Sequence, residues 1–160
     1  MGAAHLNTLL QEALNPSEVC LRRSGYSFRV NDKVMQIRNN YDKEVFNGDI
    51  GTVSSLDLEE RKLTVRFDDR EVEYDITELD ELVQAYAITI HKSQGSEYPI
   101  VVMPVLMTHF VMLQRNLIYT GITRAKKLLV LVGTKKAIGY AVRNVTVTNR
   151  NTRLKERLQA

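Results

Sequence analysis

Residues 87–98 read AITIHKSQGSEY, and an apolar run follows them from 99 to 105. A second segment, NLIYTGITRAK, covers residues 116–126 and leads into an apolar run from 128 to 132. In both places a polar, glycine-containing turn lies beside a short run that is typical of a buried strand. Apolar strands that alternate with helices indicate a parallel α/β sheet. Because ligands of such sheets bind beyond the carboxyl ends of the strands, the two polar segments are the first candidates for chemistry.

The two segments resemble motifs V and VI of the superfamily 1 helicases. They are similar in particular to the RecD-like branch, which includes the exodeoxyribonuclease V alpha subunit. The order of the two motifs and their separation along the chain fit the same family. The resemblance implies that residues 81–160 belong to the second RecA-like domain of such a helicase, an α/β domain of the P-loop NTPase type with a parallel sheet.

Residues 28–80 carry a different pattern. Short runs that alternate apolar and polar residues are separated by turn residues; they cover 28–30, 34–37, 50–53, 63–67 and 72–76. Several short strands with a period of two predict a small antiparallel β-barrel. The phrases NDKVMQ (31–36) and VFNGDIG (45–51) resemble the SH3-like barrel inserted in RecD-like helicases. We expect Gly48 and Gly51 to serve backbone geometry, as a turn and a close approach.

Residues 1–27 are predicted to be a helix and a linker of the RecA-like domain, which the barrel interrupts. The helix is expected over residues 3–14 and ends before Pro16, because the residue before a proline avoids helical geometry. Its apolar face is predicted from the helical spacing of Leu6, Leu9, Leu10 and Leu14. Residues 17–27 are polar and irregular, which indicates a linker.

Helices and strands are expected to alternate after residue 82. Strands are predicted over 85–90, 98–105 and 127–132, and helices over 108–118 and 135–143. Thr134 is expected to cap the second of these helices. Residues 152–158 are predicted to form a last helical turn or to fray.

The composition sets limits on the function. The chain has 160 residues and a net charge of +3, which is mildly basic and compatible with nucleic acid without being diagnostic. A single cysteine and three histidines without ligand-like spacing predict no disulfide and no metal site. No apolar run approaches the length of a membrane span, and no signal peptide is recognisable, so we expect a cytoplasmic protein without membrane contact.

Arg124 is the candidate catalytic residue. By resemblance it is the arginine finger that reaches the γ-phosphate of ATP from across the cleft between two RecA-like domains. Arginine suits this role because it is always protonated and its planar fork matches phosphate oxygens. Such fingers contribute roughly 10³–10⁵ in rate in GTPases. The alternative is a surface arginine that pairs with a local acid.

The other candidates come from the first segment. The resemblance places Gln94, Gly95 and Glu97 beside the nucleotide, where Glu97 would accept a hydrogen bond from a ribose hydroxyl. It places Thr89, His91, Lys92 and Ser93 along the DNA, where they would contact phosphates and not bases. The alternatives are a solvated loop carboxylate for Glu97, a buried structural histidine for His91 and a solvated Lys92.

The resemblance implies the C-terminal part of an ATP-dependent 5′→3′ DNA helicase of recombination and repair. The chain contains neither the glycine-rich phosphate loop nor an acidic Walker B strand, so ATP and Mg²⁺ are expected to be held mainly by the first RecA-like domain of a longer parent, and the isolated chain is expected to be inactive. Expected partners are single-stranded DNA, that P-loop-bearing domain and the subunits of a nuclease complex. The alternatives are a non-catalytic DNA- or protein-binding module and a fragment of an RNA helicase.

Overall fold

The structure is a computed structural model and describes residues 2–145. The chain divides into two compact units, Met1–Ser93 and Gln94–Ala160. This division places the N-terminal helix in the same unit as the strands that follow it. The assignment of residues 1–27 to the RecA-like domain therefore stays a prediction. Each unit is described by itself below.

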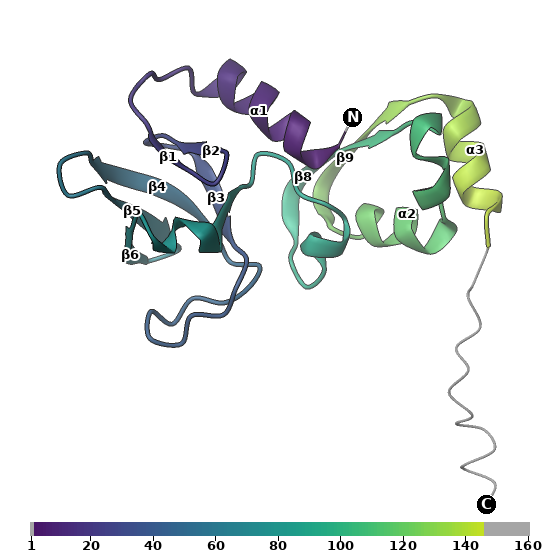
Figure 1. Ribbon diagram of the computed structural model, residues 1–160. Coiled ribbons are helices and arrows are strands. Elements are labelled where there is room, and N and C mark those ends of the chain that lie inside the picture. Colours follow the sequence, from purple (N-terminus) through teal and green to yellow (C-terminus); the bar gives the residue numbers. More distant parts are fainter. Residues whose placement is uncertain (1, 146–160) are drawn as a thin grey trace, which may run out of the picture. The chain divides into compact units, whose positions relative to one another are not determined.

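The first unit consists of helix α1 (Ala3–Leu14), a hairpin of β1 (Leu21–Arg23) and β2 (Tyr26–Phe28), and a five-stranded antiparallel sheet (Figure 1). The strands of the sheet are β3 (Lys33–Gln36), β4 (Ile50–Asp57), β5 (Lys62–Phe67), β6 (Arg70–Asp75) and β7 (Leu82–Gln84). They pair in the order β6-β5-β4-β3-β7, and a short 3₁₀ helix η1 (Glu78–Glu81) leads into β7.

One face of the sheet forms the core of the first unit. Along β5, Leu63, Val65 and Phe67 are buried, and the residues between them are more exposed. Leu63 lies opposite Tyr74 of β6, and Val65 lies opposite Val72. The alternation seen in the sequence therefore sets the register, because a shift by one residue would turn every apolar side chain away from the core.

The sheet is open, and the predicted closed barrel is not confirmed. Its edge strands β6 and β7 each pair with one neighbour, and β1 and β2 form a separate two-stranded sheet. A bulge between Val53 and Ser55 bends β4, as expected where a small sheet curls. The edge strand β7 has only three residues, which limits the pairing it can offer.

Both glycines singled out in this unit have the predicted roles. Gly48 has a φ of +103°, which L side chains rarely adopt, and lies in a turn. A Cβ at Gly51 would lie 2.5 Å from Cγ1 of Val65 and 2.9 Å from the carbonyl oxygen of Arg66, so β4 and β5 could not approach as they do.

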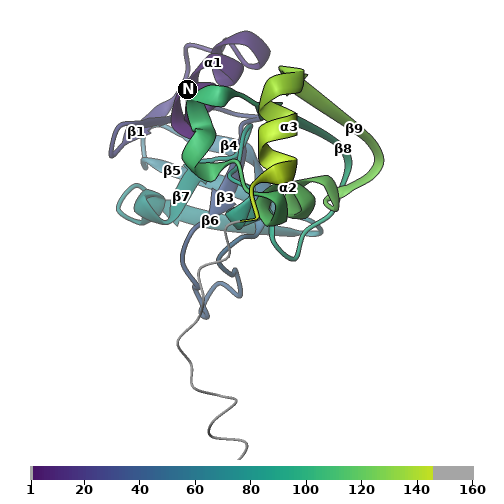
Figure 2. The same cartoon turned by 90° about the vertical axis from the view of Figure 1, so that its right-hand side faces the viewer.

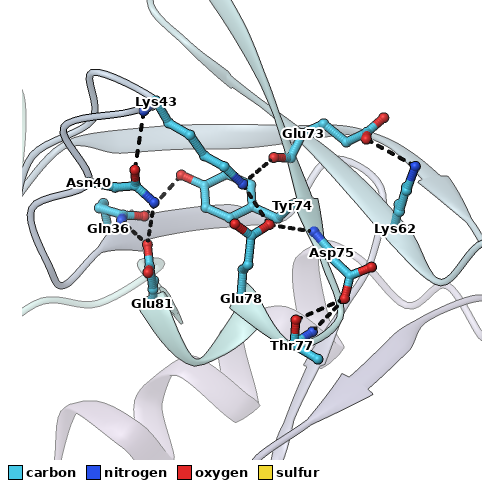
Figure 3. Close-up of polar contacts among 10 residues, drawn as sticks. All are labelled: Gln36, Asn40, Lys43, Lys62, Glu73, Tyr74, Asp75, Thr77, Glu78 and Glu81. Atoms are coloured by element: carbon cyan, nitrogen blue, oxygen red, sulfur yellow. Dashed lines mark hydrogen bonds and ion pairs between the residues drawn. The ribbon is translucent and has the colours of Figure 1, made fainter.

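A polar cluster holds the long loop between β3 and β4 against the sheet (Figure 3). The buried Tyr74 hydroxyl donates to Oε1 of Gln36 at 3.0 Å, and the Gln36 amide donates to Glu81 at 2.8 Å. From the loop, Lys43 donates to Glu78 at 2.6 Å, and its Nζ lies 4.5 Å from the centroid of the Tyr74 ring. Burial, with the charge of Glu81 next in importance, raises the pKa of Tyr74 well above its usual range.

Helix α1 has the predicted bounds, but its predicted apolar face is only partly buried. The helix buries Asn7 and Gln11 fully and Leu6 and Leu10 in part, whereas Leu9 and Leu14 are exposed. Gln11 donates to the buried carboxylate of Asp32 and to the carbonyl of Ser27. Sequence periodicity identified the helix but not its buried side, because a buried acceptor favours an amide over a leucine.

The second unit contains a two-stranded parallel sheet of β8 (Tyr98–Val105) and β9 (Ala125–Gly133). Helix α2 (Arg115–Ile122) contacts β9 and helix α3 (Lys135–Arg143), and α3 also contacts the 3₁₀ helix η3 (Met107–Met112) (Figure 2). Thr134 caps α3 as predicted, since its hydroxyl oxygen accepts from the N–H of Ala137 at 3.2 Å. The parallel pairing confirms the α/β class predicted for this part of the chain.

The β8–β9 pair has one buried side and one open side. Met103 and Val105 are buried on one face. The opposite face carries cross-strand pairs of exposed apolar residues: Ile100 with Leu128, Val102 with Val130, and Pro104 with Val132. Ile100 is 58% exposed and Val102 is 62% exposed. Parallel sheets are normally covered on both faces, so this face is incomplete in the part of the chain that the structure describes.

Several local predictions need correction. Residues 85–90 contain no strand, and the strand in this region is β7 at residues 82–84. The predicted linker 17–27 contains the β1–β2 hairpin, whose turn places Ser24 and Gly25 at positive φ. The predicted helix 108–118 is replaced by η3 and α2 with a break at Leu113. The last predicted helical turn, 152–158, lies outside the described residues.

Candidate nucleotide and nucleic-acid site

Arg124 joins the two motif segments of the second unit. Its Nη1 donates to the carbonyl oxygen of Ser96 at 3.0 Å, in the first segment. Within its own segment, Nε donates to the carbonyl of Thr120 at 3.3 Å and Nη2 donates to the hydroxyl of Thr123 at 3.2 Å. The structure therefore brings together residues that are 28 positions apart in sequence.

The backbone of Arg124 is fixed on both sides. Its N–H donates to the carbonyl of Gly121 in the last turn of α2 at 3.2 Å, and its carbonyl accepts from the N–H of Tyr98 at 2.8 Å. Arg124 thus lies between the end of α2 and the start of β8. This position results from local sequence, because a two-residue connection, Thr123 and Arg124, joins the helix to β9.

The charge of Arg124 is not neutralised by an acid. All three of its hydrogen bonds go to neutral oxygens, and no carboxylate among residues 2–145 lies within ion-pair distance of it. The nearby Glu97 pairs instead with Lys126 at 3.0 Å. A guanidinium has five N–H donors, so this half-buried cation retains donors for a further ligand. The alternative of a surface arginine paired with a local acid is not what the structure shows.

Gln94, Gly95 and Glu97 lie on the same exposed loop, which Arg124 holds through Ser96. Gly95 has a φ of +87° and open space where a side chain would stand. The loop backbone is therefore accessible at this residue, as close contact with a phosphate would require. Glu97 uses Oε2 for Lys126, which leaves its other carboxylate oxygen available as an acceptor.

The remaining candidates belong to the first unit and form the turn η2 (His91–Ser93) and the residues before it. Thr89, His91 and Lys92 are exposed, so the alternative of a buried structural histidine is excluded for His91. Ser93 differs from them, because it is only 6% exposed and its hydroxyl donates to the carbonyl of Ile90 at 2.7 Å. The structure therefore gives Ser93 a role in closing the turn and not an exposed position.

Sequence reasoning missed the residues that support Arg124. Thr120, Thr123 and the Ser96 carbonyl orient the guanidinium, and Lys126 holds Glu97. The proximity of Thr123 and Lys126 to Arg124 in the sequence was the available signal. No sequence signal could have identified the Ser96 carbonyl, because every residue has a backbone carbonyl and the residue type does not show which one accepts a hydrogen bond.

Metal and membrane features are absent from the described part of the chain. No three histidine, cysteine or acidic side chains among residues 2–145 gather in an arrangement that could hold a metal ion. No helix in the same range has the length and apolar character needed to cross a membrane.

Two family models match the sequence. Residues 6–67 match the SH3 domain of ATP-dependent RecD-like DNA helicases, and residues 84–132 match the C-terminal domain of UvrD-like helicases. The first match covers most of α1, the β1–β2 hairpin and the strands β3 to β5, and the second covers both motif segments.

Two curated proteins illustrate the relationship. The chain is 40% identical over 160 residues to the ATP-dependent RecD2 DNA helicase of Deinococcus radiodurans, covering 100% of this chain and 22% of that protein. It is 34% identical over 143 residues to the RecBCD enzyme subunit RecD of Haemophilus influenzae, covering 89% of this chain and 21% of that protein. The chain therefore spans about a fifth of the length of these relatives.

A solved structure supports the fold. The Pif1 helicase from Bacteroides in complex with ADP-AlF3 and single-stranded DNA aligns with 99% of this chain and 43% of its own, with a TM-score of 0.62 and 19% identity. At this identity the likeness concerns the fold alone, and it agrees with the mixed α/β architecture of this chain.

Proposed function

We propose that this chain supplies the arginine finger and part of the single-stranded DNA track of an ATP-dependent 5′→3′ helicase. The premise is that the chain belongs to the RecD-like DNA helicases and forms a C-terminal part of one. The motor would be completed by a P-loop-bearing domain elsewhere in the same parent protein. A role in recombination and repair, alone or with the subunits of a nuclease complex, follows from the relatives named RecD.

The observation that carries the proposal is the position of Arg124. Its guanidinium is anchored to both motif segments by hydrogen bonds to neutral oxygens and has no acidic partner among residues 2–145. A fixed and uncompensated cation suits an anionic ligand, because its charge need not be released from another ion pair before binding. Its planar fork matches phosphate oxygens.

The chemistry assigned to Arg124 is electrostatic. In the parent it would contact the γ-phosphate of ATP and stabilise the charge that develops on the transferring phosphoryl group. Thr120, Thr123 and Ser96 would hold the guanidinium in place so that little reorganisation is needed. Gln94 and Gly95 would lie beside the nucleotide, and the free oxygen of Glu97 would accept from a ribose hydroxyl.

The DNA track is assigned to the exposed residues around η2. Thr89, His91 and Lys92 can donate to phosphate oxygens without reading bases, as a motor that moves along any sequence requires. Ser93 is assigned to the support of this turn through its bond to Ile90. Mg²⁺, together with most of the ATP contacts, is assigned to the P-loop-bearing domain.

The open apolar face of the β8–β9 pair supports the assignment to a larger protein. Three cross-strand pairs of apolar residues lie exposed on a parallel sheet that should be covered on both faces. The rest of a RecA-like domain in the parent would provide that cover. A self-sufficient binding module would be expected to bury this face, so the non-catalytic alternative is less well supported.

The test is the ATPase activity of the parent protein with single-stranded DNA. Arg124→Ala is expected to reduce turnover by roughly 10³-fold, in line with other arginine fingers. Arg124→Lys is expected to fail nearly as badly, because an ammonium lacks the fork. Because Arg124 makes three side-chain hydrogen bonds, its replacement is expected to lower the free energy of unfolding by about 1–3 kcal/mol, more than at an ordinary surface site. A thermal melt of each variant must therefore accompany its assay.

Arg115→Ala is the matched control. Arg115 begins α2, the helix that ends just before Arg124, and its Nε also donates to a backbone carbonyl, that of Val142 at 2.7 Å, but it makes none of the contacts that join the two motif segments. The control should lose a similar hydrogen bond and keep near-normal turnover. Near-normal turnover in a folded Arg124→Ala protein would remove the arginine-finger assignment.

A further inference from the structure

The net charge of +3 conceals a strong separation of charge along the chain. Residues 1–93 contain 11 lysines and arginines and 17 acidic residues, whereas residues 94–160 contain 11 lysines and arginines and 2 acidic residues. The boundary coincides with the division between the two compact units. Among the described residues of the second unit the single carboxylate, Glu97, is paired with Lys126. The second unit is therefore a strongly cationic body.

Helix α3 concentrates these charges on one side. Ala137 and Ala141 form its buried face. Lys136, Tyr140 and Arg143 are spaced by four and three residues, so they share one exposed side of the helix, which flanks the buried face. None of Lys135, Lys136 and Arg143 has an ion pair among residues 2–145, so their charges remain available.

This exposed side is hollowed. A concavity of about 440 Å³ is lined by Met107, Lys135, Lys136, Gly139, Tyr140, Arg143 and Asn144. All its charged lining residues are cations. The larger hollow in the first unit, of about 970 Å³, is lined by Glu12 and Glu18 as well as by Arg22, Arg23 and Arg29, so carboxylates are mixed with its cations. Of these two hollows, the one on α3 is lined by cations without a carboxylate and is the better suited to an anion.

Gly139 lies at the centre of the cationic face. A Cβ there would have open space, with Nη2 of Arg143 as its nearest neighbour at 3.9 Å. Packing therefore does not require glycine, although glycine inside a helix costs roughly 0.5–1 kcal/mol relative to alanine. Its effect is to leave the helix backbone uncovered between Lys136 and Arg143, where a ligand can approach closely.

The two lysines at the start of α3 are also unfavourable for the helix itself. Lys135 and Lys136 occupy its first turn, which contains no acidic residue. Cations destabilise a helix N-terminus because they add to the positive end of the helix dipole. The two lysines in the first turn and the glycine inside the helix thus both reduce the stability of α3. In return, they leave a positive and accessible surface at the concavity.

We infer that this concave face of α3 is a second contact surface for single-stranded DNA, separate from the motif residues. Lys135, Lys136 and Arg143 contact phosphates, and Tyr140, which is 41% exposed, stacks on a base. The choice of DNA over RNA rests on the proposed helicase function. The recognition of phosphates rests on the cations and the concavity of α3 and is independent of that function.

The test is the binding of a fluorescent 20-nucleotide oligo-dT to the 160-residue chain, followed by anisotropy over a series of salt concentrations. A triple variant, Lys135→Ala, Lys136→Ala and Arg143→Ala, should raise Kd at least tenfold at low salt. It should also lower the slope of log K against log salt by about 2, since each phosphate contact on a single strand contributes about 0.7.

A second triple variant controls for net charge. Arg22→Ala, Lys33→Ala and Arg66→Ala removes three exposed cations of the first unit that have no ion pair among residues 2–145, so the change in net charge is the same. This control should change Kd by less than about threefold. Equal losses in the two triple variants, each shown to be folded by its thermal melt, would overturn the inference.

Tyr140 provides an independent arm. Tyr140→Phe keeps the ring and should bind normally, whereas Tyr140→Ala should weaken binding by about tenfold. Tighter binding of oligo-rU than of oligo-dT would overturn the assignment to DNA. The oligonucleotide assay contains no ATP, whereas the arginine-finger assignment is measured by ATP turnover, so failure here and failure of that assignment are separate results.

Discussion

Asp32 shows how far a single residue can organise the first unit. Its side chain is fully buried and accepts hydrogen bonds from Gln11, Asn15 and Tyr86, at 2.5, 2.7 and 2.9 Å, and from the N–H of Arg29 at 2.8 Å. Gln11 lies in α1 and Asn15 directly follows this helix. Arg29 directly follows β2, and Tyr86 lies in the segment after β7. A buried carboxylate is tolerated only when it is satisfied in this way, so Asp32 fixes the four segments relative to one another.

The hydroxyl of Tyr86 makes this site sensitive to alkaline pH. Burial and the hydrogen bond to Asp32 raise the pKa of Tyr86 to about 12. A raised pKa means that the contribution to stability is complete below the unfolded value of about 10 and is lost as the pH rises towards 12. The difference in unfolding free energy between the wild-type chain and Tyr86→Phe should therefore shrink between pH 10 and pH 12.

Urea unfolding at a series of pH values would measure this difference. Tyr74, whose pKa is also raised by burial, is present in both proteins, so the comparison isolates Tyr86. The charges that face Tyr86 are those of Asp32 and Arg29. A difference that stays constant up to pH 12 would show that the Tyr86 hydroxyl does not stabilise this site.

Helix α1 illustrates, at the scale of an element, that polar side chains can decide how a helix packs. Asn7 donates to the carbonyl of Ala87 at 2.8 Å and accepts from the N–H of the same residue at 2.8 Å. Gln11 reaches Asp32 and Ser27 from the next turn. The two amides are four residues apart and share one face, so α1 is held to the first unit by directed hydrogen bonds.

Replacing Gln11 should therefore cost more than replacing a leucine of the same helix. Gln11→Ala removes donors from a buried carboxylate and should destabilise the chain by about 2–3 kcal/mol. Leu9→Ala, at a side chain that is 43% exposed, should cost less than about 0.5 kcal/mol. Thermal or urea unfolding of both variants provides the measurement. A greater loss for Leu9→Ala would show that the leucines form the packing face after all.

At the scale of the whole molecule, the two units divide the proposed functions. The first unit is acidic overall and carries the turn assigned to the DNA track, and the second is basic and carries Arg124 and the α3 concavity. Neither unit contains a glycine-rich phosphate loop with its lysine. These are the groups that hold the β- and γ-phosphates of ATP. The chain is thus suited to complete an ATP site and not to form one.

The purified 160-residue chain should consequently hydrolyse no ATP, with or without single-stranded DNA. Steady-state phosphate release measures this, and the parent helicase assayed in parallel provides the positive control. Turnover that is stimulated by DNA and copurifies with the chain through successive columns would contradict the division of roles proposed here.

The sequence by itself determined the family and the α/β class of the second part. Motif V and motif VI are defined by residue type and order, so Arg124, Gly95 and their neighbours could be proposed as site residues without coordinates. Strands with clear periodicity, such as β5, β8 and β9, were located to within a few residues, because alternation and continuous apolar runs are local properties. Thr134 was predictable for the same reason, as capping depends on adjacent residues.

Only the tertiary structure decided what depends on distant partners. It buried Asn7 and Gln11 more deeply than the leucines of α1, which depends on the acceptor Asp32, more than 20 residues away from Gln11. It left the sheet of the first unit open, because closure depends on whether edge strands find partners and not on their alternation. It tied Arg124 to a backbone carbonyl and gathered the cations of α3 around a concavity, since neither a main-chain acceptor nor a surface shape is encoded in residue type.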